Sequence, residues 1–136
     1  MASGIYNVFK GNLFNKQVNM GSGGDTVKVA LMNNSHTFTA TNTVWSDVSA
    51  NEASGTNYTA GGATLANKSV TVAATTKWDA DDATWATATI TAYHAVVYDT
   101  TNTNSLVCSF DFGGAKTATA GTFTIQWDAN GLITLA

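Results

Sequence analysis

The segment SDVSANEASGTNYTAGG, residues 46–62, gathers groups that could carry out acid–base chemistry. It contains Glu52, the only glutamate of the chain, together with an aspartate, several hydroxyl groups and Tyr58. Catalytic carboxyl groups need neighbours that shift their pKa toward the working pH. No basic residue lies near Glu52 in the sequence, so an activated carboxylate pair is not predicted. We predict a structured connection, anchored by a buried Tyr58 ring whose hydroxyl stays in water. Any functional surface here would be a contact surface.

A second acidic cluster, WDADDATW at residues 78–85, places three aspartates close together. Such carboxylates can bind calcium, but the cluster lacks the glycine and the glutamate that an EF-hand loop has at its sixth and twelfth positions. Calcium also needs six or more oxygen ligands. We therefore predict no metal site, and instead a solvated acidic loop between two strands, with Trp78 and Trp85 entering the core.

Histidine and cysteine, the other residues typical of catalytic sites, lie in apolar surroundings. His94 belongs to the apolar face of a strand-like run, where a hydrogen-bonded core histidine is the expected role; His36 is the only other histidine. Cys108 lies between Leu106 and Phe110, without a cationic neighbour to activate the thiol. No catalytic and no cofactor-binding residue is predicted, and we expect a protein that is not an enzyme and has no cofactor.

The composition narrows the class of partner. Only 11% of the 136 residues are charged, all six basic residues are lysine, and the net charge is −3. Nucleic-acid binding favours a basic stripe and arginine, so no nucleic-acid partner is expected. No membrane partner is expected either, because no apolar run approaches the length of a membrane span and no secretion signal is apparent. One cysteine excludes an internal disulfide.

The chain divides into an N-terminal arm and a main body. Ile5, Phe9 and Leu13 recur at helical spacing, which predicts a short amphipathic helix over residues 5–14 with Ser3 as a possible N-cap. GSGG at residues 21–24 is typical of a hinge. We therefore expect an arm and glycine-rich hinge over residues 1–24, followed by one domain over residues 25–136.

The main body shows a succession of strand patterns, with turns made by glycine, asparagine and aspartate because proline is absent. The run at residues 86–99 becomes almost continuously apolar, which predicts a central strand covered on both faces. In SLVCSFDF we expect Leu106, Cys108, Phe110 and Phe112 on one face. The pattern predicts an all-β fold, an antiparallel β-sandwich or jelly roll. Further expected strands lie in DTVKVALM (25–32), KSVTVAATTKW (68–78) and FTIQWDANGLITL (123–135).

The C-terminal segment predicts a hairpin with a defined register. A two-residue turn at Asn-Gly would mix apolar and polar faces, whereas a three-residue loop at residues 129–131 pairs Trp127 with Ile133 and closes the apolar face. This loop is a type I turn begun by Asp128, with Gly131 in the left-handed conformation.

Five blocks in this order resemble a family of small tailed-bacteriophage virion proteins: DTVKVALM, SDVSANEASGTNYTAGGATL, DDATWATATITAYHAVVYD, DFGG and GTFTIQWDANGLITL. The likeness runs from about Asp25 to the C-terminus. It implies a β-sandwich or jelly roll, no enzymatic activity and no catalytic residues to transfer. Members are capsid decoration (cement) proteins or proteins associated with tails and fibres. Asn57 stands where the family pattern would have a second glycine.

The first function that this resemblance implies is capsid decoration. Such a protein is made in the host cytoplasm and binds the outer surface of the phage capsid, and its partners are the major capsid protein and copies of itself. The N-terminal arm would dock on the particle or lock the oligomer, unless its helix packs on its own sandwich. The expected contact residues are Ile5, Tyr6, Phe9, Leu13, Phe14, Glu52 and Tyr58.

The second function is recognition of host surface glycan by a module associated with a tail or fibre. Exposed aromatic rings would carry it, because sugar faces stack on them. The candidate rings are Trp45, Tyr58, Trp78 and Trp85.

Overall fold

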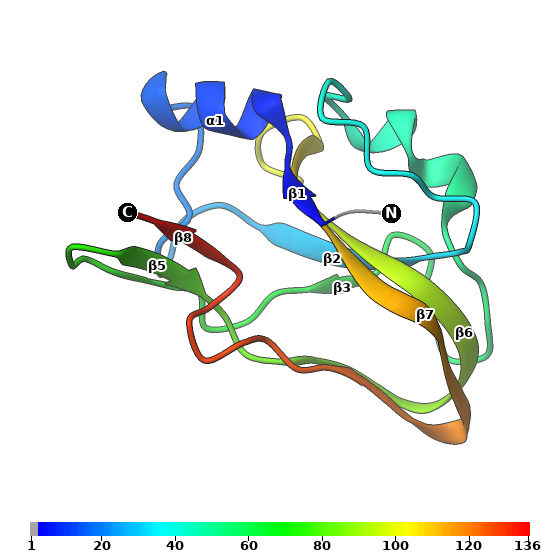
Figure 1. Cartoon of the computed structure of the whole chain (residues 1–136). Coiled ribbons are helices and arrows are strands. Elements are labelled where there is room, and N and C mark those ends of the chain that lie inside the picture. Colours follow the sequence, from blue (N-terminus) through cyan, green and yellow to red (C-terminus); the bar gives the residue numbers. More distant parts are fainter. Residues whose placement is uncertain (1–2) are drawn as a thin grey trace.

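The computed structural model describes residues 3–136, whose strands form two antiparallel sheets (Figure 1). One sheet has the order β1-β7-β6-β2-β3 and the other the order β4-β5-β8. The predicted all-β fold is confirmed and is consistent with a sandwich, whereas a jelly roll is not confirmed. The strands are β1 (Gly4–Ile5), β2 (Val27–Met32), β3 (Ala63–Thr64), β4 (Ser69–Thr71), β5 (Thr76–Asp79), β6 (Ala83–Asp99), β7 (Ser105–Ile125) and β8 (Ile133–Leu135).

The N-terminal helix is shorter than the sequence pattern suggests. Ile5 pairs with Cys108 in β1, and α1 runs only over Asn7–Phe14. Ser3 is not the N-cap that was predicted, because its hydroxyl accepts a hydrogen bond from the backbone N–H of Asp111 instead. The residues before α1 thus form their hydrogen bonds with the edge of the sheet, and the helix begins only after them. Two short 3₁₀ helices, η1 (Trp45–Asp47) and η2 (Ser49–Asn51), complete the helical structure of the described residues.

The link between α1 and β2 lies where a hinge was expected. The N–H of Gly24 donates to the carbonyl of Gly21, and the N–H of Asp25 donates to the carbonyl of Asn19, so the glycine-rich segment forms a closed turn. Residues before this link also belong to the fold, because β1 is an edge strand of the five-stranded sheet.

β6 lies at the centre of the larger sheet, between β7 and β2, as the apolar run at residues 86–99 predicts. Its second half, from His94 to Asp99, is buried without interruption, whereas its first half alternates buried residues with exposed threonines. β2 forms in the expected strand at residues 25–32, and its residues Val27, Val29 and Leu31 share one face, because all three pack in the same cluster.

A β-bulge overturns one predicted face of β7. Tyr98 pairs with Leu106 while Val97 pairs with Cys108, so Val107 is an extra residue in β7. An inserted residue reverses the side to which the following side chains point. Leu106 consequently packs with Tyr98 on one face of the sheet, and Cys108 packs in the main core on the other. The prediction that both share a face is wrong for this reason.

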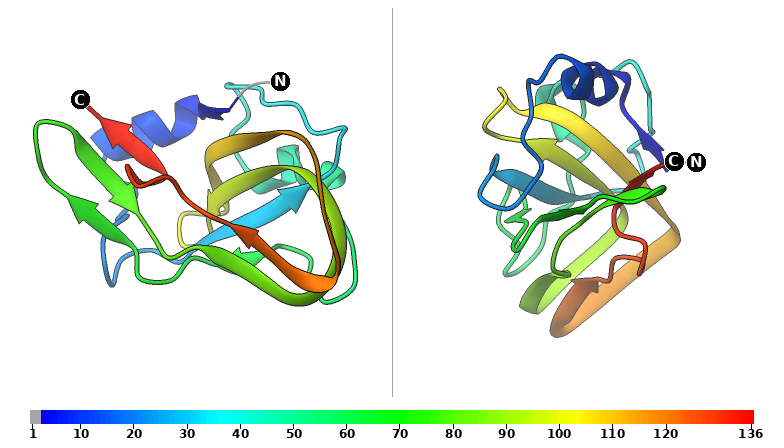
Figure 2. Two further views of the ribbon diagram at one scale, coloured as in Figure 1. Left: turned by 60° about the horizontal axis from the view of Figure 1, so that its bottom comes forward. Right: turned by 90° about the vertical axis from the view of Figure 1, so that its left-hand side faces the viewer.

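The paired strands β6 and β7 form a long ribbon that curls strongly (Figures 1 and 2). Its register shifts between Trp85 and Ala88 and at three further places. Thr87 and Ala120 hold left-handed backbone conformations, with φ of 52° and 47°. Bulges increase local twist and bend a strand, so these irregularities account for the curvature.

The segment at residues 68–78 is a hairpin and not one continuous strand. β4 pairs with β5 after a turn at residues 73–75, in which the Thr76 hydroxyl bonds to both backbone groups of Ala73. Val70 and Val72, which alternate with polar residues in this segment, are 46% and 84% exposed.

The C-terminal turn forms as predicted, but its strand finds another partner. The N–H of Gly131 donates to the Asp128 carbonyl, and Gly131 has a φ of 83°. β8 then pairs with β5, with Ile133 opposite Trp78, while Ile125 pairs with Ala83 of β6. The predicted pairing of Trp127 with Ile133 is wrong, because the apolar face closes against a more distant strand.

Candidate docking surface

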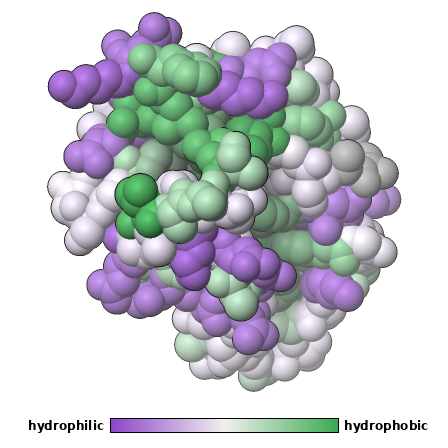
Figure 3. Space-filling view, turned by 60° about the vertical axis from the view of Figure 1, so that its left-hand side comes forward, coloured by the Kyte–Doolittle hydropathy of each residue, from purple (hydrophilic) through white to green (hydrophobic). Residues whose placement is uncertain are grey.

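The exposed large apolar side chains gather mainly at one end of the molecule. Leu13, Val70 and Leu135, which are 37%, 46% and 54% exposed, line one apolar groove between α1 and the three-stranded sheet. We call this surface the docking face. Figure 3 shows hydrophobic residues gathered there between hydrophilic ones. The remaining residues that line the groove are Phe9, Met20, Thr76, Lys77, Trp78 and Ile133.

The two layers of the docking face are held together by the core beneath it. Phe9 of α1 is buried, and the indole N–H of Trp78 donates to the carbonyl of Met20 at 2.8 Å. Phe9, Met20 and Trp78 belong to the main core cluster. The groove therefore has a fixed floor and an exposed rim, which is the shape of a preformed contact site.

Lysines flank the docking face. Lys77 lines the groove itself, and Lys16 lines an adjoining hollow that shares Leu13, Met20 and Val70 with it. Lys10 lies one helical turn before Leu13 and is exposed. Two lysines thus line the groove and the hollow beside it, which favours a partner with apolar and acidic groups.

The structure divides the predicted contact residues into buried and exposed groups. Tyr6 and Phe9 are buried, so they stabilise the fold and are not free to dock. Burial raises the pKa of Tyr6 to about 12, although Ser109 opposes the shift. Leu13 lies on the docking face, and Phe14 is 94% exposed at the end of α1. Val70 and Leu135 join the face without having been predicted, because only the pairing of β4, β5 and β8 brings them beside α1.

Glu52 and Tyr58 lie away from this face, in the segment at residues 46–62. The Glu52 Oε1 atom accepts hydrogen bonds from the Tyr58 hydroxyl at 2.8 Å and from the N–H of Gly61 at 2.6 Å. The Tyr58 hydroxyl also accepts one from the N–H of Leu31. It is therefore not left in water as predicted, because two protein groups bind it. Burial raises the pKa of Tyr58 well above its usual range, and the Glu52 carboxylate adds to this.

The rest of this segment has structural roles as well. The Asp47 carboxylate accepts hydrogen bonds from the N–H groups of Thr43 and Val44, which lower its pKa. Asn57, where the resemblance called for glycine, has a φ of 59° and donates its side-chain amide to the Thr87 carbonyl. Asparagine tolerates this left-handed conformation better than most residues. The segment is a structured connection, as predicted.

The two histidines lie together in the interior. Their rings meet edge to face with centroids 5.2 Å apart, and His36 Nε2 lies 2.9 Å from the Ser109 hydroxyl. Burial, and next the neighbouring His94, lower the pKa of His36 to about 4. Burial also lowers the pKa of His94, against the effect of Asp111, whose carboxylate lies 3.7 Å from the ring. This arrangement favours two neutral core histidines.

The acidic loop at residues 78–85 and Cys108 have structural roles. The carboxylates of Asp81 and Asp82 accept hydrogen bonds from Asn67 and from the N–H of Trp127. Cys108 is buried, which raises the pKa of its thiol far above the usual range. Among residues 3–136, no three histidine, cysteine or acidic side chains are placed to hold a metal ion.

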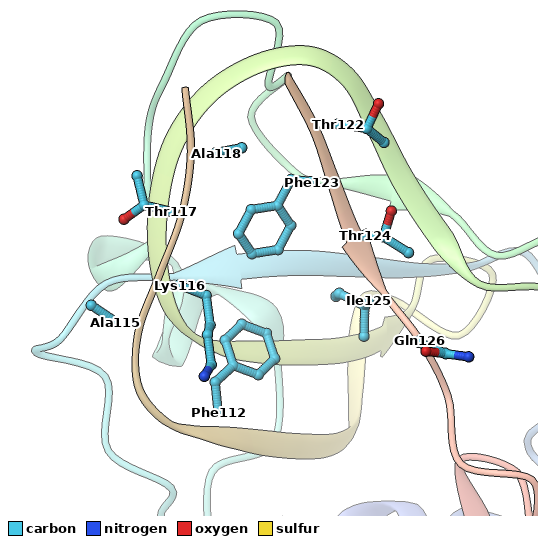
Figure 4. Close-up of a pocket in the computed structure, with 10 residues that line it drawn as sticks. All are labelled: Phe112, Ala115, Lys116, Thr117, Ala118, Thr122, Phe123, Thr124, Ile125 and Gln126. Atoms are coloured by element: carbon cyan, nitrogen blue, oxygen red, sulfur yellow. The ribbon is translucent and has the colours of Figure 1, made fainter. Parts of the chain in front are cut away.

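Most aromatic candidates for glycan binding are buried. Tyr58, Trp78 and Trp85 belong to the main core cluster. Trp45 is partly exposed and stacks on Tyr98, with ring centroids 4.5 Å apart. A hollow instead lies on the inner side of the curled β7, with a volume of about 590 Å³ (Figure 4). Phe112, several threonines and Gln126 line it.

Comparison with known proteins finds no matching family model, no matching curated protein and no matching solved structure. None of the described helices is long and apolar enough to cross a membrane.

Proposed function

We propose that the protein is a virion structural protein that decorates a phage capsid, binding and stabilising its outer surface. The observation that carries this proposal is the docking face, an exposed apolar groove flanked by lysines on a chain with few charged residues. Exposed apolar patches on soluble proteins mark interaction sites. The order of sequence blocks that resembles virion proteins supports the same role.

The docking face also fits the chemistry that such a role requires. A decoration protein performs no reaction, and its contact surface must be rigid enough to bind repeated copies of one partner. The floor formed by Phe9, Met20 and Trp78 supplies that rigidity. The partner would be the major capsid protein, through a surface that offers apolar side chains and carboxylates to the groove and its lysines.

The test is cosedimentation of the purified protein with capsid shells assembled from the major capsid protein of the virus that carries this sequence. Val70→Asp and Leu135→Asp place a charge in the groove without removing a buried group, and each should weaken binding about ten-fold or more. Thr84→Asp, on the exposed side of β6, is the matched control and should bind normally. Equal binding by all three variants would move the contact elsewhere, and no binding by the native protein would refute the proposal.

A glycan-binding module is the second candidate, and the hollow in β7 is what favours it (Figure 4). Phe112 is only partly buried there and lies among hydroxyl and amide groups. Titration with soluble oligosaccharides would shift the NMR signals of Phe112 and Gln126 if this role were correct. Unchanged signals with a broad panel of sugars would exclude it.

A further inference from the structure

Two carboxyl groups, one buried and one partly exposed, meet at the end of the larger sheet. Asp99 is the last residue of β6 and pairs with Val27 of β2. Asp25 lies two residues before Val27, and residues two apart in an extended chain share a face. Asp99 has no exposed surface. The pair thus connects the link between α1 and β2 with the turn between β6 and β7.

The hydrogen bonds of Asp99 account for only one of its two oxygens. Its Oδ1 accepts from the N–H groups of Thr101 and Asn102 at 3.0 and 3.1 Å. Its Oδ2 is buried and receives no N–H or O–H donor from residues 3–136. The side-chain partner of Asp99 is the Asp25 carboxyl group. Two carboxyl groups can hydrogen-bond only if one of them carries a proton.

Asp25 is tied to the link in turn. Its Oδ2 accepts from the N–H of Asn19 at 3.0 Å, while its own N–H donates to the Asn19 carbonyl at 2.8 Å. Asn19 and Met20 line the hollow beside the docking face, as does Asp25 itself. The protonation state of the carboxyl pair therefore affects the position of the residues that form one wall of that hollow.

The other charged groups nearby leave the pair without a close cation. Lys28 of β2 pairs with Tyr98, so it lies on the opposite face of the sheet from Asp99. Ser105, the partner of Asp99 in β7, is neutral and accepts a hydrogen bond from Asn12 of α1. Lys16 of the link lines the same hollow as Asp25, and Lys10 is exposed on α1.

We propose that Asp25 and Asp99 share one proton and form a pH-sensitive latch, which holds the link between α1 and β2 against the β6–β7 turn. When the proton is lost, two adjacent carboxylates repel each other, and the carboxylate of Asp99 is buried. The link then loosens, and the wall of the hollow formed by Asn19 and Met20 loosens with it. This inference is independent of the proposed function.

The direction of the pH effect follows from proton linkage. Burial, and next the hydrogen bond with Asp25, raise the pKa of Asp99 to about 7 from an unperturbed 3.8, against the opposing effect of the Asn102 and Thr101 N–H groups. The folded chain therefore binds a proton that the unfolded chain has released between these two values. The contribution of the pair to stability falls as the pH rises across this window and stays low above it.

The experiment compares the native protein with Asp99→Asn by thermal unfolding at about pH 5 and about pH 8. Asparagine keeps an oxygen for the N–H groups of Thr101 and Asn102, and its amide donates to Asp25 at every pH. The variant should melt several degrees above the native protein at the higher pH, and this advantage should be clearly smaller at the lower one. Asp128→Asn is the matched control, because it removes an exposed charge but keeps the turn bond to the N–H of Asn130.

Amide hydrogen exchange gives a local readout. After correction for the intrinsic pH dependence of exchange, the N–H groups of Asn19 and Asp25 should lose about ten-fold or more protection at the higher pH in the native protein, and not in Asp99→Asn. An advantage of the variant that is equal at both pH values would overturn the proposal. So would a rise in native stability at high pH on addition of millimolar calcium or magnesium, which would show that the pair binds a cation and not a proton.

Discussion

The hydroxyl of Tyr58 donates a hydrogen bond to the Glu52 carboxylate at 2.8 Å, in the middle of the segment whose composition most resembles an active site. The same hydroxyl accepts the backbone N–H of Leu31, in the buried strand β2. Glu52 is therefore bound to its own segment through Tyr58 and Gly61. The only glutamate of the chain is used to fasten a loop to the sheet.

Replacement of Tyr58 by phenylalanine should destabilise the protein by about 1–3 kcal/mol, because it leaves the N–H of Leu31 buried without an acceptor. Glu52→Gln is the control, since its amide oxygen still accepts from Tyr58 and Gly61. Chemical denaturation measures both. A loss of stability in Glu52→Gln as large as in Tyr58→Phe would show that the negative charge, and not the hydrogen-bond geometry, holds the loop.

Gly131→Val should be costly, whereas Asn130→Ala should change little. Gly131 has a φ of 83°, and a β-carbon there would clash with the Trp78 carbonyl oxygen. The strain of the left-handed conformation alone is about 1–3 kcal/mol, and the steric conflict adds to it. Asn130 uses only its backbone N–H, which donates to Asp128 Oδ1. Thermal melts check both, and a large loss in Asn130→Ala would contradict this turn.

Acid should weaken the native protein through His36. Its pKa falls from 6.5 in the unfolded chain to about 4 in the folded one, so the unfolded state binds the additional proton between these values. The contribution of His36 to stability is therefore full above about pH 6.5 and falls on the order of 3 kcal/mol as the pH drops toward 4. Denaturation across this range should show the loss as the difference between the profile of the native protein and that of His36→Gln.

This effect opposes that of Asp99, whose contribution to stability increases toward acid pH. The native profile alone cannot separate the two. Each single variant removes one of them, so subtraction of its profile from that of the native protein isolates the contribution of the replaced group.

Helix α1 should show two different responses to truncation of its phenylalanines. Phe9→Ala removes a buried ring and should cost about 3–5 kcal/mol. Phe14→Ala removes a ring that is 94% exposed and should change stability by less than about 0.5 kcal/mol. Denaturant midpoints test this, and similar losses for both would mean that Phe14 packs on the protein in solution.

Strands whose pattern depends on local alternation were predictable from the sequence. The faces of β2 and the central place of β6 follow directly from apolar spacing. The face of Leu106 was not predictable, because the extra residue in β7 has no signature in a run of consecutive apolar side chains. The turn at Gly131 was predictable from its residues, but the partner strand of β8 was not, since β5 offers an equally apolar surface through Trp78.

The docking face could not be predicted from the sequence either. Leu13 carries a helical signal, and Val70 carries a strand signal, but each signal predicts burial within its own element. The exposure of both residues arises because a short hairpin and a short helix each cover only part of the other. Only tertiary arrangement decides which apolar residues remain uncovered.

The pairing of β1 with β7 has a consequence for the order of folding during synthesis. Gly4 pairs with Ser109, and Thr76 of β5 pairs with Leu135 of β8. In each pair, the residue that leaves the ribosome earlier must therefore wait for a partner that leaves it much later. Folds dominated by such distant pairings form slowly, on the order of milliseconds to seconds. Until then the apolar strands have no covering layer, so nascent chains of this protein should depend on chaperones more than their modest size suggests.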